Sequence, residues 1–445
     1  MKIVLLSGGS GQRLWPFSNG SRTKQFLKVL KDEKGELESM VQRVWRQLQE
    51  AGLAGSTYIA TNGSQEELIR SQLGDSIPLI IEPERRDTFP AVALVSAYLF
   101  SEANVPEDEA VCVLPVDPFV ENAFYDKVKE LEDVLQHSDV QVALIGSRPT
   151  YPSEKYGYIV PASRSSDSSD TAIPIKSFIE KPNQMVAEHL IESGALWNCG
   201  IFAFKLQFLL GLLREKGFPV TYPELAKEYD TLSKTSFDYE VLEKAKQMKV
   251  IVYEREWKDL GTWNTLTEEM NNPVTGKGIV STDSTNSHVV NELDIPVILL
   301  GLSNIIVAVS SDGILVSDKA ASPRIKDMAE LFKDIPMYEE LRWGWYRILD
   351  FSRREKENDT LIKKIVIHAG EHIRTHYHRS RKEIWCIQSG TGMAILEGRL
   401  HRVQSGDCLQ IPENTKHSIM ALKELTLIEV QIGSGLIGED TFEEP

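Results

Sequence analysis

The first residues of the chain hold the feature that most constrains its fold. Lys2–Leu6 is a short apolar run of the kind that forms a buried parallel strand. It leads into the glycine-rich run Ser7-Gly8-Gly9-Ser10-Gly11, and two cations, Arg13 and Lys24, follow. Glycines let a backbone approach a ligand closely enough for its N–H groups to face phosphate oxygens. The pattern fits either a tight turn between strand and helix or a loop that binds a polyphosphate.

Two familiar phosphate loops do not match this run. A P-loop ends in Gly-Lys-Ser/Thr, whereas this chain has Gln12-Arg13 there. The dinucleotide fingerprint requires a third small residue at the position of Leu14. A phosphate-binding loop here would therefore be of another kind.

Chain length and net charge limit the classes of molecule that this protein can bind. The 445 residues are enough for two or three domains. A net charge of −16 argues against nucleic acid polymers and anionic membranes as partners. No apolar run approaches the roughly 20 residues that a membrane span needs, and the chain opens on a strand without the pattern of a signal peptide. We expect a cytoplasmic protein. Anionic small molecules remain possible substrates, provided that local cations or a metal bind them.

Strands and helices alternate over the first 150 residues. The predicted strands include Thr57–Ala60, Ala110–Leu114 and Val140–Ile145, and apolar periodicity predicts helices over Ala91–Phe100 and Phe124–Leu135. This alternation predicts an α/β domain with a parallel sheet and helices on both faces. Ligands of such sheets bind beyond the carboxyl ends of the strands.

Charged residues follow several of these strands. Arg86 and Asp87 stand between a strand and a helix, and Asp117 follows the strand at Ala110–Leu114. Asp259 lies in Trp257-Lys258-Asp259-Leu260-Gly261-Thr262-Trp263. Each has a structural explanation, since Asp87 fits a helix cap and the other two fit turns.

Three further segments carry polar residues of the same kind. They are Tyr156-Gly157-Tyr158-Ile159, Phe178-Ile179-Glu180-Lys181-Pro182 and Trp197-Asn198-Cys199-Gly200-Ile201-Phe202. Each alone fits strand and turn chemistry.

In this order, the motifs of residues 1–270 resemble the nucleotidyltransferases that make sugar nucleotides, and the mannose-1-phosphate guanylyltransferase branch in particular. The resemblance implies catalytic roles for Arg13, Lys24, Asp117 and Asp259, with both aspartates holding Mg²⁺. It implies nucleotide binding by Leu6, Gly8, Gly9, Gly11, Arg86 and Asp87. It implies sugar-phosphate binding by Gly157, Glu180, Lys181 and Asn198.

The chain departs from this family at three positions. Thr23 replaces the usual Pro before Lys-Gln-Phe, Asp87 replaces an Asn, and Pro118 replaces the His after the metal-binding Asp. The added charge of Asp87 is unfavourable beside a triphosphate unless a cation compensates it. The resemblance implies GTP and mannose 1-phosphate as substrates and a homodimer as the assembly.

The C-terminal part resembles a cupin. Its two motifs place Gly370, His376, His378, Glu383 and Gly390, then Gly406, Pro412 and His417, at the usual spacing, with Asn414 where a Gly is usual. Residues i and i+2 of a strand face the same side, so His376 and His378 point into one barrel. With Glu383 and His417 they form a set suited to Zn, Fe, Mn or Ni.

The predicted architecture is therefore an α/β chain in three parts. These are a Rossmann-like nucleotidyltransferase sheet domain at 1–270, a short β-helix-like segment at 271–335 and a cupin β-barrel at 336–445.

Two alternatives to a simple guanylyltransferase remain. One adds phosphomannose isomerase activity in the cupin; the other is a non-catalytic sugar-nucleotide sensor. Relative to the isomerase-fused family, two residues are inserted between His378 and Glu383, and Ile384 replaces the His after the Glu. The insertion also shifts Arg379 or Arg381, so the sequence favours a bound metal over isomerisation. A sensor would be favoured by loss of Asp117 or Asp259, and both are present.

Overall fold

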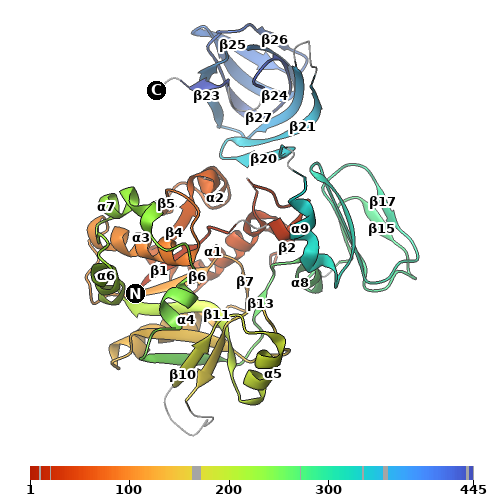
Figure 1. The fold of residues 1–445 in the computed structure, drawn as a ribbon. Helices are drawn as coiled ribbons and strands as arrows, with labels where there is room; N and C mark the ends of the chain where they lie inside the picture. Colours follow the sequence, from red (N-terminus) through yellow and green to blue (C-terminus); the bar gives the residue numbers. More distant parts are fainter. Residues whose placement is uncertain are drawn as a thin grey trace. The chain divides into compact units, whose positions relative to one another are not determined.

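The chain forms two compact units in the computed structural model, which describes residues 1–9, 12–20, 22–162, 172–270, 272–332, 335–353, 359–436 and 440–443 (Figure 1). The first unit comprises Met1–Gly11, Lys24–Glu66 and Asp75–Met270. The second comprises Gln12–Thr23, Glu67–Gly74 and Asn271–Pro445. The short segment Gln12–Thr23 thus belongs with the C-terminal half of the chain. The predicted three-part division stays a prediction.

The first unit is built from strands and helices that alternate along the chain. Its strands are β1 (Lys2–Leu6), β2 (Leu30–Lys31), β3 (Leu37–Glu38), β4 (Thr57–Asn62), β5 (Leu79–Glu82), β6 (Ala110–Pro115), β7 (Pro118–Phe119), β8 (Val142–Ser147), β9 (Tyr158–Pro161), β10 (Ile173–Ile179), β11 (Leu196–Lys205), β12 (Met248–Tyr253) and β13 (Lys258–Asp259). Its helices are α1 (Met40–Glu50), α3 (Thr88–Ser101), α4 (Phe124–Gln136), α5 (Gln184–Glu192), α6 (Leu206–Glu215), α7 (Tyr222–Lys227) and α8 (Trp263–Glu268), and α2 (Glu66–Leu73) begins at its boundary.

The main sheet has nine strands in the order β5-β4-β1-β6-β11-β8-β12-β10-β9. Its β5-β4-β1-β6 half is parallel, as the sequence predicts. Beyond β6 the sheet is mixed: β11, which the prediction did not include, inserts between β6 and β8 and runs antiparallel to both, whereas β8 and β12 pair in parallel. The strand predicted at Val140–Ile145 is β8, two residues further on.

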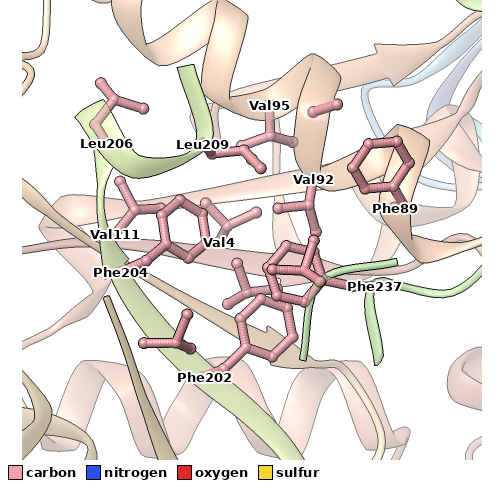
Figure 2. Close-up of a cluster of buried hydrophobic side chains, with 14 of the residues drawn as sticks. Val4, Phe89, Val92, Val95, Val111, Phe202, Phe204, Leu206, Leu209 and Phe237 are labelled. Atoms are coloured by element: carbon pink, nitrogen blue, oxygen red, sulfur yellow. The ribbon is translucent and has the colours of Figure 1, made fainter. Parts of the chain in front are cut away.

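Helix α3 and strand β11 form the centre of the hydrophobic core. Helix α3 is apolar almost throughout because it is buried along most of its length against the sheet. Figure 2 shows Phe202 and Phe204 of β11 gathered with the α3 side chains and Phe237. The rings of Phe202 and Phe237 stack, with centroids 4.2 Å apart and an interplanar angle of 4°. Core packing therefore fixes the segment around Phe237, whose next residue, Asp238, lies at the site described below.

The Asn271–Pro445 part of the second unit begins with short parallel strands. Strands β14 (Val274–Thr275), β16 (His288–Asn291) and β18 (Ile305–Ser310) pair in parallel, and β15 (Gly278–Val280) pairs in parallel with β17 (Val297–Leu299). Successive short parallel pairings of this kind are those of a β-helix-like coil, as predicted. Strand β19 (Gly313–Asp318) then returns antiparallel to β18, and the short helix α9 (Ile325–Ala329) follows.

The later strands of the Asn271–Pro445 part form a barrel of antiparallel strands, the cupin that the sequence predicts (Figure 1). Its core gathers buried apolar side chains, among them Trp385 and Leu427. Its strands are β20 (Tyr338–Leu341), β21 (Gly344–Ser352), β22 (Asp359–Ile367), β23 (His372–Tyr377), β24 (Arg381–Leu396), β25 (Arg399–Gln404), β26 (Cys408–Ile411), β27 (His417–Gly433) and β28 (Phe442–Glu443). Among the described residues, no helix is long and apolar enough to cross a membrane.

Candidate active site and candidate metal centre

Two adjoining pockets of the first unit lie where β1 and β6 end. The first has a volume of about 320 Å³ and the second about 210 Å³. Their shared wall is formed by Pro115, Asp117, Gly200 and Asp238. A ligand with two parts could therefore place one part in each pocket, with its reacting bond beside Asp117.

Lys24 and two aspartates meet at this wall. The pairing of β7 with β13 sets Asp259 opposite Pro118, the residue after Asp117, so two segments far apart in sequence converge. The Lys24 ammonium lies 2.5 Å from Asp117 Oδ2 and 3.3 Å from Asp259 Oδ1. Burial alone would lower the pKa of Lys24, but the two carboxylates outweigh burial and raise it. Lys24 is therefore a cation held between two anions.

This donor set fits Mg²⁺. Two carboxylates that share one cation present the hard oxygen ligands that Mg²⁺ takes from proteins, with its remaining positions left for phosphate oxygens and water. The Lys24 ammonium stands where a metal cation would be attracted. Asp117 and Asp259 would hold the ion.

The glycine-rich run lines the first pocket through Leu6, Gly8 and Gly9. A Cβ on Gly8 would lie 3.1 Å from Oε1 of Glu82, so the close approach of the two segments favours glycine there. Glu82 accepts a hydrogen bond from the Tyr229 hydroxyl at 2.9 Å, and burial raises the pKa of Glu82. Glu82 lines this pocket and was not among the predicted site residues.

Two predicted residues of this loop, Gly11 and Arg13, are not among the described residues that line the first pocket. Gly11 lies outside the described residues. Arg13 is exposed in a short 3₁₀ turn, Gln12–Leu14, and belongs to the second unit. Their roles stay predictions.

Arg86 and Asp87 also line the first pocket. Asp87 caps α3, because its carboxylate accepts a hydrogen bond from the backbone N–H of Thr88 at 2.8 Å. The Arg86 guanidinium contacts Glu84 at 2.5 Å and donates to the Leu232 carbonyl at 3.1 Å. The capping explanation of Asp87 is thus correct, and it is compatible with a place beside the ligand.

The four residues predicted to bind the sugar phosphate all line the second pocket. A Cβ on Gly157 would lie 2.5 Å from Oε2 of Glu180, so only glycine leaves room for that carboxylate. The Lys181 ammonium contacts Glu180 Oε1 at 2.8 Å, and the Asn198 amide donates to Asp238 Oδ1 at 2.8 Å. A cation, a carboxylate and an amide together suit a ligand with a phosphate and hydroxyl groups.

Asp238 is the main residue that the sequence did not reveal. It begins a π-helical turn, Asp238–Leu242, and lines both pockets. Burial, with the nearby Glu180 charge, raises the pKa of Asp238 to about 7. A single Asp in a polar stretch carries no local signal, because its position depends on the stacking of Phe237 in the core.

In the barrel, three imidazoles converge. Strand pairing sets His376 opposite His417, and a nitrogen from each of His376, His378 and His417 lies within 4.8 Å of the others. Each Nδ1 lies near a backbone carbonyl: that of Arg374 at 2.8 Å, that of Asp440 at 2.6 Å and that of Thr415 at 2.8 Å. These contacts favour a proton on Nδ1, so each Nε2 keeps a lone pair for a metal.

Glu383 completes this set at ligand spacing. Its oxygens lie 2.9 Å from His378 Nε2 and 3.5 Å from His417 Nε2. Atoms that share a metal at about 2.1 Å stand roughly 3 to 3.5 Å apart. His417 Nε2 is buried without a hydrogen-bond partner, which a bound metal would supply. The four residues therefore fit a transition metal.

The buried Arg381 lies beside this set. Its Nη2 is 3.3 Å from His378 Nε2 and donates to the Thr441 hydroxyl at 2.9 Å. Arg381 belongs to the inserted stretch between His378 and Glu383 that distinguishes this chain from the isomerase-fused family. Its guanidinium faces the same lone pair that a metal would use at His378.

Comparison with known proteins agrees with this arrangement. Residues 2–275 match the family described as nucleotidyl transferase, and residues 335–444 match the family described as mannose-6-phosphate isomerase C-terminal. The chain belongs to the nucleotidyl transferase family, in its mannose-1-phosphate guanylyltransferase branch, and carries a cupin of the second family. The family resemblance drawn from the sequence is thus confirmed.

Individual relatives match along nearly the whole chain. The chain is 30% identical to a putative mannose-1-phosphate guanylyltransferase of Vibrio cholerae, with 98% of each protein covered. It is 29% identical to mannose-1-phosphate guanylyltransferase 2 of Escherichia coli O157:H7, covering 98% of this chain and 96% of the relative. A solved structure described as mannose-1-phosphate geranyltransferase from Thermus thermophilus is 26% identical, with a TM-score of 0.61, and matches 75% of this chain and 99% of its own.

Proposed function

We propose that this protein transfers GMP from GTP to mannose 1-phosphate and releases pyrophosphate. The observation that carries the proposal is the Lys24 ammonium between Asp117 and Asp259, at the wall shared by two pockets. The first pocket, which the glycine-rich run lines, would take GTP. The second pocket would take mannose 1-phosphate, and the bond that forms would lie between them. The relatives named as mannose-1-phosphate guanylyltransferases support this choice of substrates.

The reaction requires an in-line displacement at the α-phosphorus of GTP. A phosphate oxygen of mannose 1-phosphate forms the new P–O bond as the bond to the β-phosphate bridging oxygen breaks, and pyrophosphate leaves with that electron pair. Positioning and charge neutralisation supply the catalysis, so no covalent enzyme intermediate is required. Lys181 would hold the phosphate of the nucleophile, and Asn198 and Glu180 would orient the sugar hydroxyls.

Cations at the shared wall would stabilise the transition state. Mg²⁺ held by Asp117 and Asp259 would neutralise charge on the triphosphate and orient it. Lys24, once released from its carboxylates, would reach the phosphate charge that develops. We assign Arg13 to the triphosphate on the family resemblance.

A pyrophosphate-release screen tests the substrates. The full chain is incubated with Mg²⁺, each of the four ribonucleoside triphosphates and several sugar 1-phosphates. GTP with mannose 1-phosphate should give the highest kcat/KM. The assignment would be overturned if a nucleoside triphosphate with another base, or glucose 1-phosphate, gave a kcat/KM about tenfold higher than this pair. Tenfold corresponds to about 1.4 kcal/mol in transition-state binding.

The cupin suggests a second candidate activity, phosphomannose isomerisation. The convergence of three imidazoles favours it, and the Arg381 guanidinium 3.3 Å from His378 Nε2 disfavours it. The test is conversion of fructose 6-phosphate to mannose 6-phosphate by metal-loaded protein, with His378→Ala as the control. Conversion by the parent chain that His378→Ala abolishes would establish the isomerase activity. If the parent chain converts no fructose 6-phosphate, the metal serves binding or structure.

Other expectations remain predictions. The homodimer would appear as twice the chain mass in light scattering. The cytoplasmic location and the absence of nucleic acid and membrane partners rest on charge and sequence pattern. A non-catalytic sensor is disfavoured, since both predicted metal-binding aspartates line the second pocket.

A further inference from the structure

The segment Gln12–Thr23 connects two parts of the nucleotide pocket. Gly8 and Gly9 precede it and Lys24 follows it directly, and all three line the first pocket. Yet the segment itself belongs to the second unit. Contacts that hold Gln12–Thr23 in place therefore restrain Gly9 and Lys24 through the covalent backbone.

Trp15 is the first point of attachment. Its ring stacks on Phe332, with centroids 6.2 Å apart and an interplanar angle of 11°. On another side it lies against Gly313, where a Cβ would come within 2.6 Å of the indole ring. Glycine at 313 thus leaves the space that the indole fills.

The turn between β18 and β19 makes two polar attachments. The Ser310 hydroxyl donates to the Pro16 carbonyl at 2.8 Å, and the Asn19 amide donates to Asp312 Oδ2 at 2.6 Å. The other Asp312 oxygen accepts the Met337 N–H at 2.6 Å. One turn therefore holds both the middle of the segment and the strand region that leads into the barrel.

Arg22 is the last attachment, two residues before Lys24. It is buried, its guanidinium contacts Glu292 at 2.8 Å, and it lies 4.9 Å over the Tyr338 ring. A buried charge pair is costly to break from one side, because the remaining charge is left uncompensated. This contact fixes the chain immediately before Lys24.

We propose that the second unit positions the nucleotide-binding loop for nucleotidyl transfer. Gly313, Asp312 and Glu292 are positioning residues: they touch no substrate and act through the segment Gln12–Thr23. This inference rests on the proposed function for its effect on rate. A displacement of about 1 Å at a reacting group costs on the order of a hundredfold, so a small shift of this segment is sufficient to be measured.

The first test compares two glycine substitutions in the full chain. Gly313→Ala places a methyl group against the Trp15 ring, whereas Gly398→Ala adds one to a barrel turn with nothing within 4 Å. Gly313→Ala should raise the KM for GTP at least tenfold and leave the KM for mannose 1-phosphate unchanged. Gly398→Ala should change neither constant. The inference would be overturned if Gly313→Ala and Gly398→Ala had the same KM for GTP. It would also be overturned if Gly313→Ala raised the KM for GTP and the KM for mannose 1-phosphate equally.

A second test needs no activity. Amide hydrogen exchange across residues 12–23 should be faster in Gly313→Ala than in the parent or in Gly398→Ala; unchanged exchange would overturn the attachment. If the parent transfers no nucleotide to any sugar phosphate, the proposed function fails, and this measurement still decides the attachment.

A charge exchange gives an independent check. Arg22→Glu and Glu292→Arg should each raise the KM for GTP, and the double variant should recover most of the loss. A positioning contact would be contradicted if the KM for GTP of the double variant rose by the product of the two single-variant increases.

Discussion

Replacing Lys24 by Met separates its two functions at the shared wall. In the structure its ammonium satisfies both Asp117 and Asp259, the carboxylates that we assign to Mg²⁺. The ammonium and the metal ion therefore compete for the same oxygens. Lys24→Met keeps the unbranched chain up to the Cε position and removes the ammonium charge.

The expected magnitudes follow from exposure. The Lys24 side chain is 17% exposed and that of Asp117 21%, between a surface and a buried pair. Without Mg²⁺, the free energy of unfolding should fall by about 1 to 3 kcal/mol, between the values for exposed and for buried pairs. Mg²⁺ should bind at least about tenfold more tightly, or 1.4 kcal/mol, because no ammonium competes. The value of kcat should still fall about a hundredfold, because the triphosphate loses a cation.

The assay is a Mg²⁺ titration followed by calorimetry, with urea unfolding in the absence of metal. Lys258→Met is the matched control, since Lys258 also contacts two carboxylates closely, Glu256 and Glu269, next to Asp259. It should lower stability and leave Mg²⁺ affinity unchanged. Equal Mg²⁺ affinity in the parent and in Lys24→Met would refute the competition.

Three further predictions concern the other charged groups. Asp259→Asn keeps the shape and removes charge from the metal site, so turnover should fall by about a hundredfold or more, while GTP binding without Mg²⁺ changes little; near-normal turnover would exclude Asp259 from the mechanism. The pKa of Asp238 is about 7 in the folded chain against an ordinary 3.8, so the native state holds a proton that the unfolded chain releases. Stability should therefore fall as pH rises from about 4 to 7, and urea unfolding of Asp238→Asn should show a shallower slope in that window; an identical slope would contradict the burial argument. Finally, His417→Ala should remove the cupin metal in elemental analysis without changing pyrophosphate release, and a parent chain free of metal would rule out the centre.

The sequence predicted the site best where local pattern and position coincide. Asp117 follows an apolar strand, and the carboxyl end of such a strand is a place where ligands bind, so its position could be inferred before the structure. Asp259 needed the family resemblance, because its approach to Asp117 depends on a two-residue pairing of β7 with β13. Motif spacing was sufficient to group His376 with His378, although β23 ends at Tyr377 and His378 lies just beyond it.

Long-range packing explains what the sequence did not reveal. The antiparallel β11 enters the sheet from beyond residue 195, and no periodicity tells where a strand inserts. Asp238 lines both pockets, and the residue before it, Phe237, stacks on Phe202 in the core. The attachment of Trp15 to Gly313 joins residues almost 300 positions apart. Contacts of this kind follow from the tertiary structure and leave no local pattern.

The most direct test of the central claim is the identity of the products. Phosphorus-31 NMR of the full chain with Mg²⁺, GTP and mannose 1-phosphate should show GDP-mannose and pyrophosphate appearing together in equal amounts, and neither should appear in the double variant Asp117→Asn, Asp259→Asn. Release of orthophosphate or GDP without a sugar nucleotide, or unchanged formation of GDP-mannose by the double variant, would contradict the account.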